Sequence, residues 1–327
     1  MKKISVYALV VILAFIVLFL GASDIAWNHV WGNIYQHIFY GVPLNSDGVI
    51  VYEIRLPRVI LAIIVGAILS GSGAIMQSMF KNPLIDPFLL GISSGAAFGC
   101  ALSIGLFENL PLGILAFAGA LGTSLLVIFI GKFAGGSSVS LVLSGVILSA
   151  FLSALSGSIK FFVDPQKAQA IVIWLLGSLS LASWDNVKIA LLGVVIGFVP
   201  LFLLRWKINI LGLGDSECLS LGISPYKMRF ICIVCVSFAC ALAVSVSGTI
   251  GWIGLVVPHL GRILFGSDMR KLLPGSLALG ALLLLGADTI ARTLTSYDLP
   301  VGIVTAILGA PFFIFLLSQF SAKWNGR

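Results

Sequence analysis

The chain has 327 residues, of which 59% are apolar and only 9% are charged, and its mean hydropathy is +1.14. Soluble domains carry about 25% charged residues, so this composition excludes an ordinary water-soluble domain. The net charge of +7 does not indicate a nucleic-acid-binding protein, because the cations are scattered singly and no aromatic-basic stripe accompanies them.

The apolar runs are long and continuous, and this favours helices over strands. In lipid, only helices and closed barrels satisfy their own backbone hydrogen bonds. A barrel strand would show about 10 residues of alternating polarity, whereas a bilayer-spanning helix needs about 20 apolar residues. The sequence therefore predicts an all-α polytopic membrane protein that forms one transmembrane domain over residues 1–327.

Ten membrane-spanning helices are predicted in chain order. The first follows Lys2 and Lys3 and is interpreted as an uncleaved span, since no small-residue cleavage site follows it. The eighth is short and contains Pro258 and His259, which are interpreted as structural residues that start or kink that span. A further apolar segment, 171–181, is too short to cross and is expected at the interface or dipping into the membrane. The ten predicted spans are 5–22, 58–80, 87–107, 111–131, 139–161, 187–205, 228–247, 250–266, 273–292 and 300–319.

The distribution of charge orients these spans. With the N-terminus in the cytoplasm, 13 cations and 4 acids lie inside, against 6 cations and 8 acids outside. Cytoplasmic loops of membrane proteins carry the excess of Lys and Arg. Both termini are therefore predicted to be cytoplasmic. The inside cations are Lys2, Lys3, Lys81, Lys132, Arg205, Lys207, Lys227, Arg229, Arg262, Arg270, Lys271, Lys323 and Arg327.

The stretch "RLPR" at residues 55–58 then falls on the outer face, where the rule disfavours arginine. Pro57 is read as the entrance of the second span, which places Arg55 and Arg58 at its outer mouth. The pair is interpreted either as a docking site for an external partner or as cations that reach lipid headgroups.

Two short motifs suggest an internal repeat. Ser72-Gly73-x-Ile75 is followed by Pro83, and Ser247-Gly248-x-Ile250 is followed by Pro258 at the same spacing. Because the first follows an even span and the second an odd one, the two copies would cross the membrane in opposite directions. This predicts an inverted repeat of two five-helix halves, about 1–165 and 187–320, as in many transporters.

Several function classes find no support in the residues. The cysteines Cys232 and Cys235 lack a second pair or a nearby histidine and are interpreted as small buried apolar residues, so neither a metal site nor a cofactor is predicted. There is no phosphate loop and no catalytic constellation, so an enzyme is not predicted. An ion-coupled secondary transporter stays an alternative, although the span interiors hold almost no ionisable residues. An importer component driven by a separate ATPase fits these absences.

Such a component needs a cytoplasmic contact for its ATPase, and the loop 205–229 offers one. Asp215 is expected to cap a short helix and Gly222 to end it in a left-handed conformation. Ser224 and Pro225 then begin the next helix. We predict two short coupling helices within 214–227.

Four segments resemble the permeases of bacterial ABC importers for iron chelates, haem and vitamin B12, the FecCD/BtuC-type family. They are "RLPRVILAIIVGAILSGSGAIMQSMFKNPLIDPFLLGISSGAAFG" (55–99), "LGLGDSECLSLGIS" (211–224), "SGTIGWIGLVVPHLGRIL" (247–264) and "ADTIARTLTSYDLPVGIVTAILGAPFFIFLL" (287–317). The resemblance implies ten spans per subunit, a homodimer, two cytoplasmic ATP-binding subunits and one periplasmic or lipoprotein substrate-binding protein. Ferric siderophores are the expected cargo, with haem and cobalamin as alternatives.

The resemblance also assigns roles to residues. Arg55, Arg58 and Arg292 would receive acidic residues of the substrate-binding protein, although Arg292 could instead pair with Asp288 one turn away. The expected ATPase contacts are Asp215, Ser216, Glu217, Leu219, Leu221, Gly222, Ile223 and Ser224. The pathway is expected along Ser149, Ser153 and Ser156 of the fifth span, where small-residue packing is the alternative. Asn82, Pro83 and Asp86 form a structural motif in which Asp86 caps the following helix.

Overall fold

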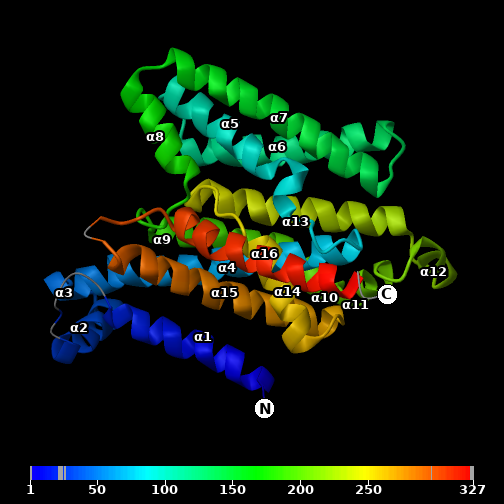
Figure 1. Ribbon diagram of the computed structural model, residues 1–327. Coiled ribbons are helices and arrows are strands. Elements are labelled where there is room, and N and C mark those ends of the chain that lie inside the picture. The colour runs from blue at the N-terminus through cyan, green and yellow to red at the C-terminus, as the bar shows by residue number, and fades with distance from the viewer. Residues whose placement is uncertain (1, 21–24, 26, 296, 325–327) are drawn as a thin grey trace.

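The computed structural model describes residues 2–20, 25, 27–295 and 297–324, and over these residues the protein is built from helices, without strands (Figure 1). Arg327 and the predicted end of the first span at 21–22 lie outside the described residues. The first half of the chain contains α1 (Lys2–Phe19), α2 (Trp27–Tyr40), α3 (Ser46–Val49), the π-helical η1 (Ile50–Arg55), α4 (Leu56–Met79), the 3₁₀-helical η2 (Pro87–Leu90), α5 (Ile92–Gly105), α6 (Leu112–Phe133), α7 (Ser138–Phe162) and α8 (Pro165–Leu175). The second half contains α9 (Trp184–Leu192), the π-helical η3 (Gly193–Phe198), α10 (Val199–Leu203), α11 (Arg205–Leu211), α12 (Asp215–Ser220), α13 (Pro225–Ser247), α14 (Ile253–Phe265), α15 (Met269–Thr293) and α16 (Val301–Trp324).

Each of the ten predicted spans coincides with an apolar helix. Six helical segments of the described chain are long and apolar enough to cross a bilayer: 46–79, 112–133, 138–162, 184–203, 225–247 and 269–293. Four shorter apolar helices, 6–19, 92–105, 253–265 and 301–314, occupy the remaining predicted positions. The predicted all-α membrane architecture is confirmed.

The helices form two groups. In Figure 1, α4, α13, α14, α15 and α16 lie together, with α1 along their outer side, while α5 to α8 form a separate lobe on the far side of α13. The lobe attaches through α6 and α5, both of which pack against α13. In the same view α1 ends close to α2, and α16 runs toward the end of the molecule that carries α11 and α12.

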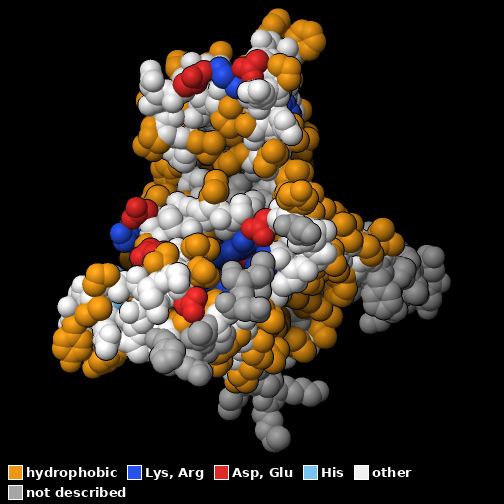
Figure 2. Space-filling view, turned by 90° about the vertical axis from the view of Figure 1, so that its left-hand side faces the viewer, with side chains coloured by type: hydrophobic (Ala, Val, Ile, Leu, Met, Phe, Trp, Pro, Cys, Tyr) orange, Lys and Arg blue, Asp and Glu red, His pale blue; other side chains and the backbone are white. Residues whose placement is uncertain are grey.

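The apolar surface follows the flanks of the molecule. Figure 2 looks onto the end of the bundle that carries α2, α3 and α9, where acidic and basic side chains gather while hydrophobic side chains dominate the sides. On α6 and α7, large apolar side chains such as Phe129, Ile147 and Phe151 are exposed. An apolar flank between charged ends is the surface that a bilayer requires.

Helix α4 lies at the centre because small residues let its neighbours approach closely. A Cβ on Gly73 would lie 1.8 Å from the carbonyl oxygen of Gly254 in α14, and a Cβ on Gly66 would lie 2.3 Å from that of Gly280 in α15. The hydroxyl of Ser70 donates to the carbonyl of Ser276 at 2.8 Å. Backbone-to-backbone contact of this kind is the usual way that membrane helices associate.

The predicted entrance at Pro57 is wrong. The helix begins at Ser46, where Asn45 accepts a hydrogen bond from the N–H of Gly48, and it continues without a break to Met79. Pro57 has no N–H, and its ring would clash with the carbonyl four residues earlier in a regular α-helix. The wider π-helical turn of η1 lies directly before it and accommodates the proline. In the same way, the π-helical η3 ends two residues before Pro200.

Two further segments have structure that the predicted spans do not describe. α2 is a 14-residue helix between the first two predicted spans. The apolar segment 171–181 consists of the end of α8 and the turn after it, with Ile171 and Leu179 buried and Val172 and Leu181 exposed, and its position relative to the membrane stays a prediction. The N–H of Ser178 donates to the carbonyl of Ser247 at 2.8 Å, which packs this segment against the end of α13.

The two repeat motifs adopt different local structures. Ser72 and Gly73 lie within α4, whereas Ser247 ends α13 and Gly248 has a φ of 67°. The inverted repeat therefore stays a prediction that these motifs alone do not support.

Candidate functional site

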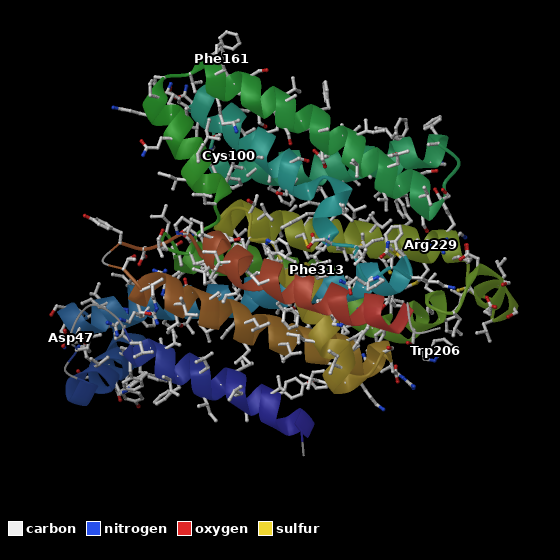
Figure 3. All side chains as sticks on the ribbon, in the orientation of Figure 1. Asp47, Cys100, Phe161, Trp206, Arg229 and Phe313 are labelled. Carbon is white, nitrogen blue, oxygen red and sulfur yellow. The ribbon has the colours of Figure 1, made fainter. Side chains whose placement is uncertain are left out.

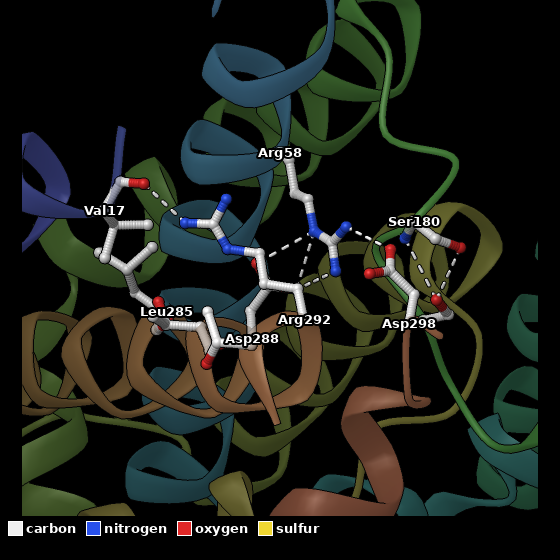
Figure 4. A network of polar contacts seen from close by, with 10 residues as sticks. Val17, Arg58, Ser180, Leu285, Asp288, Arg292 and Asp298 are labelled. Atoms are coloured by element: carbon white, nitrogen blue, oxygen red, sulfur yellow. Dashed lines mark hydrogen bonds and ion pairs between the residues drawn. The ribbon is translucent and has the colours of Figure 1, made fainter. Parts of the chain in front are cut away.

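Arg58 forms a buried ion-pair cluster at one end of α4 (Figure 4). Its Nε donates to both carboxylate oxygens of Asp288 in α15, at 3.0 and 3.1 Å, and its Nη1 donates to Asp298 Oδ2 at 2.6 Å. The side chains of Arg58 and Asp288 are 10% and 1% exposed, while that of Asp298 is 39% exposed. One guanidinium thus joins α4, α15 and the connection between α15 and α16.

Arg55 and Arg292 hold the end of α1. Arg55 Nη1 donates to the carbonyl of Leu18 at 2.8 Å, and Arg292 Nη2 donates to that of Val17 at 2.6 Å (Figure 4). The last carbonyls of a helix have no partner within it and carry the negative end of its dipole. Two arginines are therefore well suited to this position.

These contacts change what the three arginines can do. Arg55 and Arg58 are only 5% and 8% exposed as whole residues. The alternative pairing of Arg292 with Asp288 is not the one that forms, because Asp288 bonds to Arg58. Asp298 was missed by the sequence analysis, since nothing local relates it to Arg58, 240 residues away. The docking role of the arginines stays a prediction.

Within the predicted cytoplasmic loop, 205–229, α11 is followed by the short helix α12, and α13 begins after a four-residue turn. The N–H of Gly222 donates to the carbonyl of Leu219, and that of Ile223 to the carbonyl of Cys218, at 3.0 and 2.8 Å. With Gly222 at a φ of 72°, this pair of bonds is a Schellman motif. The predicted left-handed stop at Gly222 is confirmed. The second predicted short helix is the first turn of α13, which begins at Pro225 after the N-cap Ser224.

Asp215 does not cap α12, because Gly214 occupies the N-cap position. Its carboxylate instead pairs with Arg229 in α13 through two bonds, Nη2–Oδ1 at 2.5 Å and Nη1–Oδ2 at 3.0 Å. Figure 3 shows Arg229 beside α12, at the end of the molecule opposite Asp47. A two-bond Arg–carboxylate pair fixes the angle of α12 to α13.

Exposed side chains gather on this segment. Leu219 and Leu221 are 65% and 56% exposed, and Ser216, Glu217, Gly222 and Ser224 are also exposed. Ile223 is half-buried and packs toward the core. Hydrogen bonds from its own backbone N–H and from the Ser216 hydroxyl lower the pKa of Glu217, which keeps that carboxylate charged. The segment presents two leucines beside a fixed negative charge.

A cavity of about 440 Å³ lies between the end of α4 and the turn joining α11 to α12. Lys81, just after α4, donates from Nζ to the carbonyl of Leu213 in that turn, at 2.5 Å. Arg262 Nη1 donates to Gln77 Oε1 at 2.5 Å on another wall. The residues that line the cavity are Gln77, Ser78, Lys81, Asn82, Pro83, Ile208, Asn209, Gly212, Leu213, Arg262, Ser267 and Met269.

The predicted structural motif after α4, which contains Asn82, Pro83 and Asp86, forms a turn followed by a helix N-cap. Asn82 Oδ1 accepts from the N–H of Leu84 at 2.9 Å, and Asp86 Oδ1 accepts from that of Phe88 at 2.7 Å. The predicted cap at Asp86 is confirmed, although the helix that it begins is the short η2. Burial raises the pKa of Asp86 to about 6, while the Phe88 bond acts in the opposite direction.

Pro258 lies inside α14, which begins five residues earlier at Ile253. It therefore does not start that helix. His259, the next residue, is half-buried on the same helix.

The three predicted pathway serines do not share one accessible face of α7. Ser153 is exposed, Ser149 is half-buried and accepts from the Ser94 hydroxyl at 3.1 Å, and Ser156 is 3% exposed and bonds to the carbonyl of Leu152. A Cβ on Gly157 would meet no atom within 4 Å. The exposed face of α7 therefore includes Ser153 beside Ala150 and Ala154 but not Ser156, and the pathway role of the three serines stays a prediction.

Comparisons with known proteins place this geometry in a family. The FecCD transport family matches residues 9–319. A Helicobacter pylori protein named "Probable iron chelatin transport system permease protein" is 59% identical over 310 residues, 94% of this chain and 95% of that one. The hemin transport system permease protein of Yersinia pestis is 38% identical over 326 residues, 97% of this chain and 95% of that one.

Among solved structures, a metal-chelate type ABC transporter in an inward-facing conformation superimposes with a TM-score of 0.85. It is 31% identical, and the match covers 97% of this chain and 98% of that one. Matches of this length and identity, together with the helical order described above, show that the chain belongs to the FecCD transport family of ABC-transporter permeases.

Proposed function

We propose that this chain is the permease subunit of a binding-protein-dependent ABC importer that carries an iron chelate across the cytoplasmic membrane. It works as a homodimer with two ATPase subunits at the end that carries α12, and both termini are cytoplasmic. The 59% identity to the iron chelatin permease of Helicobacter pylori supports the cargo class. Within that class, a ferric siderophore is the cargo we propose, with haem as the second candidate because of the hemin permease relative.

One observation carries the ATPase contact: Leu219 and Leu221 are both more than half exposed, at the edge of a polar cytoplasmic segment. They are not on the apolar flank that faces lipid, so neither the bilayer nor the core of this chain covers them. A Schellman stop and the Asp215–Arg229 pair hold them in place. Exposed leucines on a rigid projection are typical of a protein contact.

We expect Leu219→Asp and Leu221→Asp to prevent assembly with the ATPase subunit encoded with this permease, because a carboxylate would enter an apolar contact. Co-purification from detergent, with the permease tagged, measures this. Leu294→Asp is the matched control, since Leu294 is 67% exposed in the connection between α15 and α16, remote from α12 and outside the predicted spans. Equal ATPase recovery from all variants would contradict the proposed contact, and no assembly by the unaltered chain would contradict the importer function.

At the other end of the molecule, we propose that a substrate-binding protein docks over the Arg58 ion-pair cluster. Asp298, whose side chain is 39% exposed, is the part of this cluster that a partner can reach. Asp298→Asn leaves Arg58 paired with Asp288 and removes the competing surface carboxylate. If Arg58 receives an acid of the partner, the variant should bind the substrate-binding protein about tenfold more tightly. Surface plasmon resonance on permease in nanodiscs measures this affinity. Unchanged binding would assign the cluster to folding alone, and weaker binding would make Asp298, not Arg58, the group that contacts the partner.

Cargo is tested separately, by uptake of ⁵⁵Fe into proteoliposomes that contain the complete importer. Ferric siderophore and haem are offered in parallel at equal concentration. Uptake of haem alone would replace the siderophore proposal, and uptake of neither would contradict the iron-chelate class.

A further inference from the structure

Lys81 stands in a backbone conformation that lysine rarely adopts. Its φ is 52°, one of two positive values among the described non-glycine residues. It is the residue after the C-cap Phe80 of α4, where the N–H of Asn82 donates to the carbonyl of Gln77 and that of Lys81 to the carbonyl of Ser78. This is the same Schellman stop that Gly222 makes after α12, with lysine in the place where glycine is favoured.

The contact made by the Lys81 side chain gives a reason for lysine at this strained backbone position. Its ammonium reaches the carbonyl of Leu213, 132 residues away, in the turn that leads into α12. The cavity of about 440 Å³ otherwise separates this turn from the end of α4. Among the described residues, this is the hydrogen bond that joins residues 77–83 to residues 205–222.

The two ends of this connection matter for the proposed function. One continuous helical segment, Ser46–Met79, has 34 residues and is therefore about 50 Å long. It carries Arg55 and Arg58 near its outer end, and Lys81 follows its cytoplasmic end. A rigid helix that contacts both sides can transmit displacement only if its cytoplasmic end is attached to the ATPase-facing segment.

We propose that Lys81 is a positioning residue that attaches the α11–α12 turn, and with it the ATPase-facing leucines, to the end of α4. The inference rests on the proposed importer function for its effect on transport, but the attachment itself does not. Loss of the ammonium leaves the turn held by Asp215–Arg229 on the α13 side and by packing alone, without a hydrogen bond, on the α4 side.

The test separates attachment from folding with three substitutions. Lys81→Gly removes the donor and relieves the positive φ, so thermal unfolding should occur at the same temperature as in the unaltered chain or higher. Lys81→Met removes the donor and keeps the strain. Lys81→Arg keeps a cationic donor. Lys188→Met is the matched control, because Lys188 is an exposed lysine in α9, at the end of the molecule opposite this turn, with a side chain that is 73% exposed.

Two readouts follow each variant. In permease alone, amide hydrogen exchange of residues 213–222 should be about tenfold faster in the Gly and Met variants and unchanged in the Arg and Lys188→Met variants. In the reconstituted importer, the amount of chelate transported per ATP hydrolysed should fall about tenfold in the same two variants. A lower unfolding temperature for Lys81→Gly with unchanged exchange would overturn the proposal, as would normal transport stoichiometry in that variant. If the unaltered permease does not transport at all, the proposed function fails while the exchange result still decides the attachment.

Discussion

Replacing Asp288 with alanine is expected to destabilise the folded chain by about 3–5 kcal/mol, the range for removing one partner of a buried ion pair. The side chain of Arg58 is 10% exposed, so its charge would remain buried with only Asp298 to balance it. The carboxylate that is lost accepts both bonds from Nε. Thermal unfolding in detergent, followed by exposure of buried cysteines such as Cys240, measures the effect.

A double variant distinguishes loss of the pair from loss of packing. In Arg58→Met with Asp288→Leu, both charges are removed, and most of the stability should return, because apolar replacements of a buried pair are often neutral or better. Asp298 would then be unpaired, but its side chain is 39% exposed and water can solvate it. If the double variant is as unstable as Asp288→Ala, packing rather than charge holds this end of α4.

Gly73→Ala is the second substitution with a large expected effect, a destabilisation of about 3 kcal/mol. The new methyl carbon would lie 1.8 Å from the carbonyl oxygen of Gly254, and the obstacle is backbone, not a side chain that can rotate away. α4 and α14 would therefore have to separate along their contact. The measurement is the midpoint of thermal or denaturant unfolding in detergent.

Gly122→Ala provides the matched control. Gly122 is also a glycine within a helix, α6, and a Cβ there would meet no atom within 4 Å. Alanine is the better helix former by about 1 kcal/mol, so this variant should be equally or slightly more stable. Comparable losses at both positions would mean that helix propensity, not close approach, explains the effect of Gly73→Ala.

Much of the fold could be predicted because a membrane-spanning helix is recognisable from its continuous run of about 20 apolar residues. The ten apolar segments, the cap at Asp86 and the left-handed stop at Gly222 depend on neighbouring residues, and the structure has each of them. The start of the second span could not be predicted in the same way. Proline usually marks a helix start, and nothing local shows that a π-helical turn will carry the helix through Pro57.

The candidate site was predicted less completely because its contacts join distant parts of the chain. Asp298 and the carbonyl of Val17 lie 240 and 275 residues from the arginines that bind them. An arginine beside an apolar run looks exposed in a sequence, and only tertiary packing shows that Arg58 is buried. Leu219 and Leu221 of the predicted cytoplasmic loop are exposed, which is compatible with an ATPase contact, but that role stays a prediction.

The π-helical turn of η1 has a consequence for how the outer part of α4 faces its surroundings. Each residue of an α-helix advances the side-chain direction by about 100°, and a π-helical turn inserts one extra residue into the register. Residues 46–49 are therefore rotated by about that angle relative to where an uninterrupted α-helix from Leu56 would place them. The apolar face of α4 is therefore not in line with the apolar face of residues 46–49. The same helix can bury one face against α14 and α15 and present a different face beside α2.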